Sequence, residues 1–233
     1  LSVTQPTPAF TPLPAFDPRS VPVVRVDADL PAVPPQAQTP AALRQRFAAP
    51  PVWQPEVVLE KKFTQGEPAQ ASVLVPIVLR AQPMVLLTER TAHLSTHSGQ
   101  IAFPGGRADP EDSSPAATAL REAQEEEVGL DPGCVEVLGP LSTYVTGSSF
   151  IITPIVGLVR PDAVLHANPY EVADVFEVPL AFLLDPAHHR HHVLEWGGVR
   201  REWFSMPYQD GDKNRFIWGA TAGMLRNFYR FMR

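Results

Sequence analysis

The sequence of 233 residues contains a single cysteine, Cys134, so no disulfide can form within the chain and a reducing compartment is expected. It has no uninterrupted apolar run of membrane-spanning length, and its first residues lack the charge and the long apolar stretch of a signal peptide. Basic residues are also scarce: 19 Lys and Arg against 25 Asp and Glu give a net charge of −6. Because nonspecific nucleic-acid binding usually needs a basic surface, we expect no nucleic-acid partner. Because there is no membrane-spanning run and no signal peptide, we expect a cytoplasmic protein that does not bind membranes. The sequence leaves open whether the protein forms a homodimer.

The length suits one large domain, and a hydrophobic share of 44% is enough for an ordinary core. Prolines recur through the first 40 residues, which favours extended backbone over helices or strands. Apolar residues such as Phe16 and Val24 lie between these prolines, so we expect residues 1–60 to be an extension that packs on a domain of residues 61–233. Within this extension, Thr39 and Pro40 predict the N-cap and first position of a short helix.

Strand-like and helix-like segments are mixed after residue 70. Two β-rich runs, 72–80 and 83–88, are separated by a short connection and predict a hairpin, with Pro76 indicating an edge strand or a bulge. A helix is expected over 115–127, capped by Ser113 or Ser114 and ended by Gly129. Further strands are predicted at 135–138, 150–159 and 172–178, and a closing amphipathic helix at 220–232.

Carboxylates form a stripe along the helix at 115–127. Glu122, Glu125 and Glu126 are spaced three and four residues apart, so an α-helix places them on one side. Such a stripe is often only a solvated acidic face. Here it follows a Pro-Gly-Gly turn and an acidic loop, and grouped carboxylates suit Mg²⁺ or Mn²⁺.

The stretch from Gly106 to Leu130 resembles the Nudix box, whose pattern is G-x5-E-x7-R-E-U-x-E-E-x-G-U, where U is aliphatic. Residues 121–126, Arg-Glu-Ala-Gln-Glu-Glu, match the central part, and Gly129 with Leu130 match its end. One residue is extra before Arg121, and Asp112 stands at the position of the loop glutamate. A further residue is extra before Gly129, so counting back from Gly129 selects Glu126 and Glu127 as the E-E pair. The register set by Arg121 selects Glu125 and Glu126 instead, and we adopt that register.

A second motif is similar to the signature of the coenzyme A pyrophosphatase branch, L-L-T-x-R-[SA]-x3-R-x3-G-x3-F-P-G-G. Leu86 to Thr88, Arg90, Gly99 and Phe103 to Gly106 have the right spacing, whereas Ser95 replaces the second arginine. The resemblance implies a substrate-binding loop formed by the following residues: Arg90, Gly99, Gln100, Phe103, Gly105 and Gly106.

The resemblance implies an α/β protein with the Nudix α/β/α sandwich and a curved mixed sheet. It also implies Mg²⁺- or Mn²⁺-dependent hydrolysis of coenzyme A, a small nucleotide substrate, to 3′,5′-ADP and 4′-phosphopantetheine. The metal ligands would be Glu122, Glu125 and Glu126, and the catalytic residues Arg121, Glu122, Glu125 and Glu171. Glu171 is a candidate general base, with Glu122 as the alternative. Arg121 is expected to brace the loop acid Asp112 or Glu111 rather than to contact phosphate.

Two other functions remain open at this point. The missing arginine at Ser95 would also fit a pyrophosphatase acting on ADP-ribose, a dinucleotide or a nucleoside triphosphate. A catalytically silent binding protein is a third alternative, which the complete set of glutamates disfavours. The run of four histidines at 188–192 follows a turn signal and has no cysteine partner, so we expect a solvated loop or lid rather than a metal site. The core or the substrate pocket is expected to hold five of the aromatic residues in this part of the chain: Trp196, Trp203, Phe204, Tyr208 and Trp218.

Overall fold

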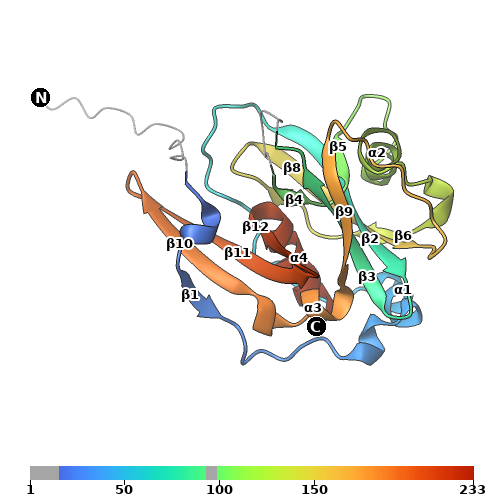
Figure 1. Ribbon diagram of the computed structural model, residues 1–233, viewed down its shortest axis with the longest axis horizontal. Coiled ribbons are helices and arrows are strands. Elements are labelled where there is room, and N and C mark those ends of the chain that lie inside the picture. The colour runs from blue at the N-terminus through green and yellow to red at the C-terminus, as the bar shows by residue number, and fades with distance from the viewer. Residues whose placement is uncertain (1–15, 93–98) are drawn as a thin grey trace, which may run out of the picture.

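The structure, a computed structural model, describes residues 16–92 and 99–233, except for the side chains of residues 126 and 127. Two sheets and four α-helices form its framework (Figure 1). The larger sheet contains β2 (Ala69–Leu79), β3 (Pro83–Arg90), β4 (Ile101–Ala102), β5 (Gly105–Arg107), β6 (Val135–Pro140), β7 (Tyr144–Val145), β8 (Phe150–Val159) and β9 (Val172–Pro179). The smaller sheet contains β1 (Val23–Val26), β10 (Arg190–Trp196), β11 (Val199–Asp210) and β12 (Lys213–Trp218). The helices are α1 (Pro40–Ala48), α2 (Pro115–Glu122), α3 (Leu180–Leu183) and α4 (Gly219–Met232). The 3₁₀ turns are η1 (Pro18–Ser20), η2 (Pro35–Gln38), η4 (Pro132–Cys134) and η5 (Pro186–His188), and a π-helix, η3 (Ala123–Glu127), continues α2.

The larger sheet is mixed, as the α/β prediction requires. β2 and β3 form the predicted antiparallel hairpin, and β2 pairs in parallel with β8 over ten residues, from Ala69 to Val78. The expectation that Pro76 marks an edge or a bulge is wrong, because β2 lies in the middle of the sheet. On one side β2 pairs with β5 up to Val73 and with β3 from Ile77, and Pro76 falls in the gap between these pairings. Its missing N–H therefore costs no ladder hydrogen bond.

The two faces of the larger sheet are covered by different elements. On β2, Leu74 and Val78 belong to a cluster with Ala119 and Ala123 of the box helix, as the apolar face of that helix predicts. The alternating residues Val73, Val75 and Ile77 instead join the main core, to which α4 and the smaller sheet also contribute. This alternation along one strand explains how β2 separates helix α2 from α4 in Figure 1.

The predicted closing helix is present as α4, but it is buried along almost its whole length instead of showing one face to solvent. From Thr221 to Tyr229 every residue is buried, and Arg230 is the exposed exception in the last turn. The helix packs against β11 and β12 on one side and contributes to the main core on the other, so it has no solvent face of normal width. None of the helices that the structure describes is long and apolar enough to span a membrane.

The histidine run at 188–192 does not form the solvated loop or lid that the sequence predicts. His189 ends the turn η5 and is fully buried, and His192 on β10 is 3% exposed. His189 donates from Nε2 to the carbonyl of Leu183 at 2.9 Å, and His192 contacts the hydroxyl of Ser205 at 2.8 Å. His189 precedes β10 and packs against Arg226 and Tyr229 of α4, whereas His192 on β10 stacks on Trp203 of the neighbouring strand β11.

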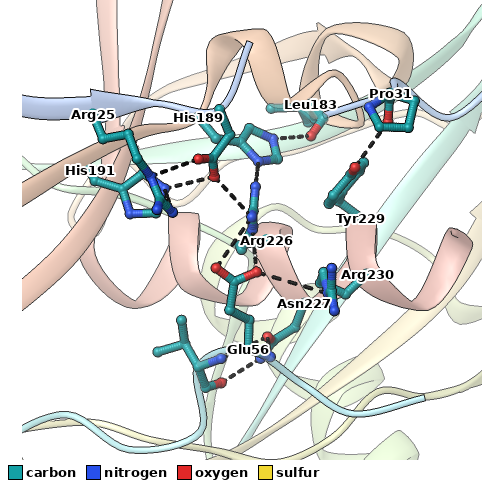
Figure 2. Close-up of polar contacts among 12 residues, drawn as sticks. Arg25, Pro31, Glu56, Leu183, His189, His191, Arg226, Asn227, Tyr229 and Arg230 are labelled. Carbon is teal, nitrogen blue, oxygen red and sulfur yellow. Dashed lines mark hydrogen bonds and ion pairs between the residues drawn. The ribbon is translucent and has the colours of Figure 1, made fainter. Parts of the chain in front are cut away.

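The described part of the N-terminal extension, residues 16–60, is fixed to the domain by a buried ion cluster (Figure 2). Arg226 of α4, only 2% exposed, pairs with Asp27 at 2.9 Å and with Glu56 at 2.8 Å. The same guanidinium donates to Nδ1 of His189 at 3.1 Å. Burial, more than any other factor, lowers the pKa of His189 to about 4, and the adjacent Arg226 adds to the effect. His189 is therefore neutral at pH 7, which leaves its Nδ1 free to accept from Arg226.

Candidate active site

The loop before α2 is held by a two-pronged ion pair. Arg121 donates from Nε to one oxygen of Asp112 at 3.0 Å and from Nη2 to the other at 2.9 Å. The same Nη2 donates to the carbonyl of Arg107 at 3.1 Å, so it also ties the glycine turn to the helix. Hydrogen bonding from Arg121 lowers the pKa of Asp112 and raises that of the guanidinium. The brace predicted between Arg121 and the loop acid is present, and Asp112 rather than Glu111 is the residue paired with it.

Glu122 lies against the glycine turn. It is 9% exposed, and one of its oxygens is 3.1 Å from Nη1 of Arg121. A Cβ atom added to Gly106 would lie 2.3 Å from Oε2 of Glu122, so only glycine leaves room for this carboxylate. At Gly105 the crowding comes from backbone, because an added Cβ would lie 2.4 Å from the carbonyl oxygen of Ser72. The Glu122 side chain and the backbone of β2 thus both pack directly against the glycine turn.

A cavity of about 1660 Å³ opens beside this turn. All six predicted substrate-binding residues line it: Arg90, Gly99, Gln100, Phe103, Gly105 and Gly106. The ends of the loop that carries them are joined by backbone hydrogen bonds, since Arg90 N–H donates to Gln100 and Gly99 N–H donates to Arg90. Ser95, which replaces the second arginine of the signature, lies outside the described residues.

A further wall of the cavity comes from the smaller sheet and the N-terminal extension, and it includes Trp203 and Trp218, which were expected in the core or along the substrate pocket. Trp203 and Trp218 lie edge to face with ring centres 6.2 Å apart, and Phe16 packs on Trp203 at 5.8 Å. Arg201 lines the same wall and donates to the carbonyls of Lys61 and Lys62. The aromatic content of this region was visible in the sequence, but nothing there indicated which strands would face the glycine turn.

Two further cations line the cavity beside the predicted residues. Arg107 follows Gly106 on β5, and Lys61 lies in the segment that leads into β2. Both side chains are exposed, so phosphate groups in the cavity could reach them. Arg107 directly follows the glycine pair in the sequence, which is the signal from which its place at the site could have been predicted.

None of the four predicted catalytic residues lines the cavity: Arg121, Glu122, Glu125 and Glu171. Glu171 directly precedes β9 and lies beside the end of β3, because its carbonyl accepts from the N–H of Thr91. Its side chain is half-buried. Glu125 is exposed on the π-helix. Among the described residues, no three Asp, Glu, His or Cys side chains come close enough to hold a metal ion.

Comparisons with known proteins agree on one family. The family model described as "NUDIX domain" matches residues 68–206. A protein of Yersinia enterocolitica named "Uncharacterized Nudix hydrolase NudL" is 47% identical over 156 residues, covering 67% of this chain and 77% of that protein. A Yersinia pestis protein of the same name is 43% identical over 176 residues, covering 75% and 85%.

The comparison with solved structures gives more distant similarities. An Ap4A hydrolase of C. elegans in a binary complex is 17% identical, with a TM-score of 0.41, covering 47% of this chain and 80% of that one. A MutT protein of Methanosarcina mazei Go1 is 20% identical, with a TM-score of 0.39, covering 52% and 83%.

Proposed function

The chain belongs to the Nudix hydrolase family, and from that premise we propose that it hydrolyses the pyrophosphate bond of coenzyme A. The reaction adds water to one phosphorus, breaks the P–O–P bridge, and yields 3′,5′-ADP and 4′-phosphopantetheine. A divalent cation, Mg²⁺ or Mn²⁺, is required. The observation that carries the proposal is the cavity at the glycine turn, which is lined by all six residues of the coenzyme A signature that were predicted to bind substrate.

The size and composition of this cavity suit an extended anionic substrate. Its volume of about 1660 Å³ exceeds the roughly 300–1,000 Å³ of ordinary small-molecule sites. Arg90 and Arg107 flank the turn and can bind phosphate oxygens through charge-assisted hydrogen bonds. The aromatic wall formed by Phe16, Trp203 and Trp218 offers flat surfaces for an adenine ring. Coenzyme A combines a base, several phosphates and a long pantetheine arm in one molecule.

The residues around Glu122 fit a divalent cation in their chemistry. The carboxylate of Glu122 is buried against Gly106, where any side chain larger than a hydrogen would collide with it. It provides the oxygen ligand that Mg²⁺ and Mn²⁺ prefer. Glu122 would hold the ion together with glutamates from the run 125–127. When bound, such an ion neutralises phosphate charge and makes water a better nucleophile. Arg121 contributes by fixing Glu122 and Asp112, so that the carboxylate is in position before substrate arrives. Glu171 and Glu122 remain the two candidates for the general base.

A substrate panel tests the proposal. The purified protein is incubated with Mn²⁺ and, separately, coenzyme A, acetyl-CoA, ADP-ribose or NADH, and kcat/KM is measured for each. We expect coenzyme A or its thioester to exceed ADP-ribose and NADH by at least about tenfold, the scale of one good charge-assisted contact. Equal rates on all four substrates would contradict coenzyme A specificity, and a preference for ADP-ribose would favour the alternative pyrophosphatase. Binding without turnover would identify a catalytically silent protein.

A further inference from the structure

A carboxylate is held in a fixed orientation in the wall of the cavity, away from the box helix. Glu60 lines the cavity, and both of its oxygens accept a hydrogen bond from the protein. The hydroxyl of Tyr144 donates to Oε1 at 2.7 Å, and the N–H of Gly147 donates to Oε2 at 2.9 Å. These two bonds fix the plane of the carboxylate, and each oxygen keeps a lone pair for a further donor.

The tyrosine that holds Glu60 is itself fixed by helix α4. Tyr144 is 2% exposed and packs against Gly223, where an added Cβ would lie 2.6 Å from the ring and 2.8 Å from the hydroxyl. Glycine inside a helix is less favourable than alanine, so this position trades helix stability for the room that the hydroxyl needs. Burial raises the pKa of Tyr144 well above its usual value, so the hydroxyl stays protonated and donates to Glu60.

The order of the strands places Glu60 far from the glycine turn. Residues 58–60 run beside β7, because Leu59 forms a bridge with Val145 and the N–H of Glu60 donates to the carbonyl of Val145. Strand β7 pairs with β8, β8 with β2, and β2 with β5, which carries the glycine turn. These four strand spacings add up to about 19 Å along the sheet. A carboxylate at that distance does not reach a metal ion or a water at the scissile phosphate, so Glu60 contacts another part of the ligand.

The corner around Glu60 continues the aromatic wall of the cavity. Arg201 lies two residues before Trp203 on β11, and therefore on the same face of that strand. Its guanidinium is 5.7 Å from the ring centre of Phe63. The N–H of Phe63 donates at 3.0 Å to the carbonyl of Gly147, the residue that also holds Glu60. Because Glu60, Phe63 and Trp203 all line the cavity, a group bound here meets aromatic rings and a fixed acceptor together.

We propose that Glu60 accepts a hydrogen bond from the exocyclic amine of the adenine base, and thereby selects adenine nucleotides. The proposal rests on the coenzyme A reaction proposed above and assigns the residue that recognises its base. An ionised carboxylate only accepts hydrogen bonds and repels phosphate, so its ligand must offer a neutral donor. The adenine amine offers two N–H groups on a flat ring, which suits the aromatic surroundings. A base without this amine would leave the carboxylate desolvated and without a donor, which is how polar sites reject such analogues.

Binding of product analogues tests the assignment without any turnover. Calorimetry gives the Kd of 3′,5′-ADP and of the 3′,5′-bisphosphate of purine riboside, in which hydrogen replaces the amine. Wild type is compared with Glu60→Leu and with Glu202→Leu, the matched control, because Glu202 is an exposed carboxylate that also lines the cavity. We expect wild type and the control to bind 3′,5′-ADP at least about tenfold more tightly than the analogue, the scale of one hydrogen bond to a charged group. Glu60→Leu should bind the two ligands within about twofold of each other.

A second variant covers the case in which Glu60→Leu folds poorly. Leucine at position 60 leaves the buried hydroxyl of Tyr144 without its acceptor, which lowers stability. The double variant Tyr144→Phe with Glu60→Leu removes the donor and the acceptor together. It should therefore melt at a higher temperature than Glu60→Leu and show the same loss of selectivity for the amine.

Several results would overturn the assignment. Equal binding of the two ligands by wild type would do so, and so would an undiminished preference for 3′,5′-ADP in both variants that lack Glu60. Loss of affinity for 4′-phosphopantetheine instead of 3′,5′-ADP would show that Glu60 contacts an amide of the pantetheine arm. Product analysis with coenzyme A tests the reaction separately, because cleavage of the pyrophosphate does not require a preference for the base.

Discussion

Replacing Gly106 with alanine perturbs the proposed site at a single point. The added Cβ would lie 2.3 Å from Oε2 and 2.5 Å from Cδ of Glu122, whereas ordinary contacts begin at 3.4 Å. The backbone at Gly106 is one that alanine adopts without strain, since its φ lies outside the left-handed region. The end of the Glu122 side chain must therefore move by about 1 Å, while the strands on either side can stay in place.

A displacement of about 1 Å in a catalytic group lowers rates on the order of 100-fold, which corresponds to roughly 2.7 kcal/mol of transition-state free energy. We expect Gly106→Ala to lower kcat/KM for coenzyme A by about that factor and to weaken Mn²⁺ binding in parallel. The thermal midpoint should fall by only a few degrees. The assay is initial rates with Mn²⁺, combined with a thermal melt of the same samples.

Gly211→Ala is the matched control. Gly211 has a φ of +59° in the turn between β11 and β12, and nothing lies within 4 Å of an added Cβ. This variant carries backbone strain of about 1 kcal/mol without touching the site. Activity of Gly106→Ala within about threefold of wild type, at an unchanged midpoint, would refute the role assigned to Glu122. A large loss of stability in Gly106→Ala but not in Gly211→Ala would show that the turn supports the fold instead.

Three further predictions concern the buried ion cluster and the substrate loop. Arg226→Met leaves Asp27 buried without its main cation, so the free energy of unfolding measured with urea should fall by about 3 kcal/mol. A fall of less than about 1 kcal/mol would contradict this. The pKa of His189 is about 4 in the folded protein and about 6.5 in the unfolded chain. The free energy of unfolding should therefore be largest above pH 6.5 and should fall by up to about 3 kcal/mol as the pH drops to 4. His189→Gln should flatten this part of the urea-derived stability profile, and an unchanged slope would show that another group titrates. Arg90→Ala should raise KM for coenzyme A more than it lowers kcat, whereas a lower midpoint with unchanged KM would make Arg90 a scaffold residue.

The sequence predicts the local elements of this fold well where short-range chemistry decides them. Ser114 caps α2 by accepting from the N–H of Ala117 at 3.1 Å, and Thr39 caps α1 in the same way at 3.3 Å. The pairing of Arg121 with Asp112 joins residues nine apart, so the loop length and the helix start nearly determine it. Such features depend on neighbours along the chain, which the sequence displays directly.

The features that the sequence did not reveal depend on contacts between distant segments. His189 is buried against Arg226 and Tyr229 of α4, and His192 contacts the carbonyl of Val21, more than 160 positions earlier in the chain. Helix α4 loses its solvent face because the smaller sheet covers it. Arg215 of β12 pairs with Glu89 and Asp174 of the larger sheet, both at 2.6 Å, so the two sheets are tied by charges that no local pattern indicated. The cavity is assembled by this same packing of one sheet against the other.

The central claim is the cleavage of coenzyme A at its pyrophosphate, and the identity of the products tests it most directly. Coenzyme A is incubated with the protein and Mn²⁺, and the mixture is analysed by mass spectrometry, with an EDTA-treated sample and Glu122→Gln as references. We expect equal amounts of 3′,5′-ADP and 4′-phosphopantetheine from the wild-type protein and neither product from the two references. Intact coenzyme A, or products cleaved at any other bond, would contradict it.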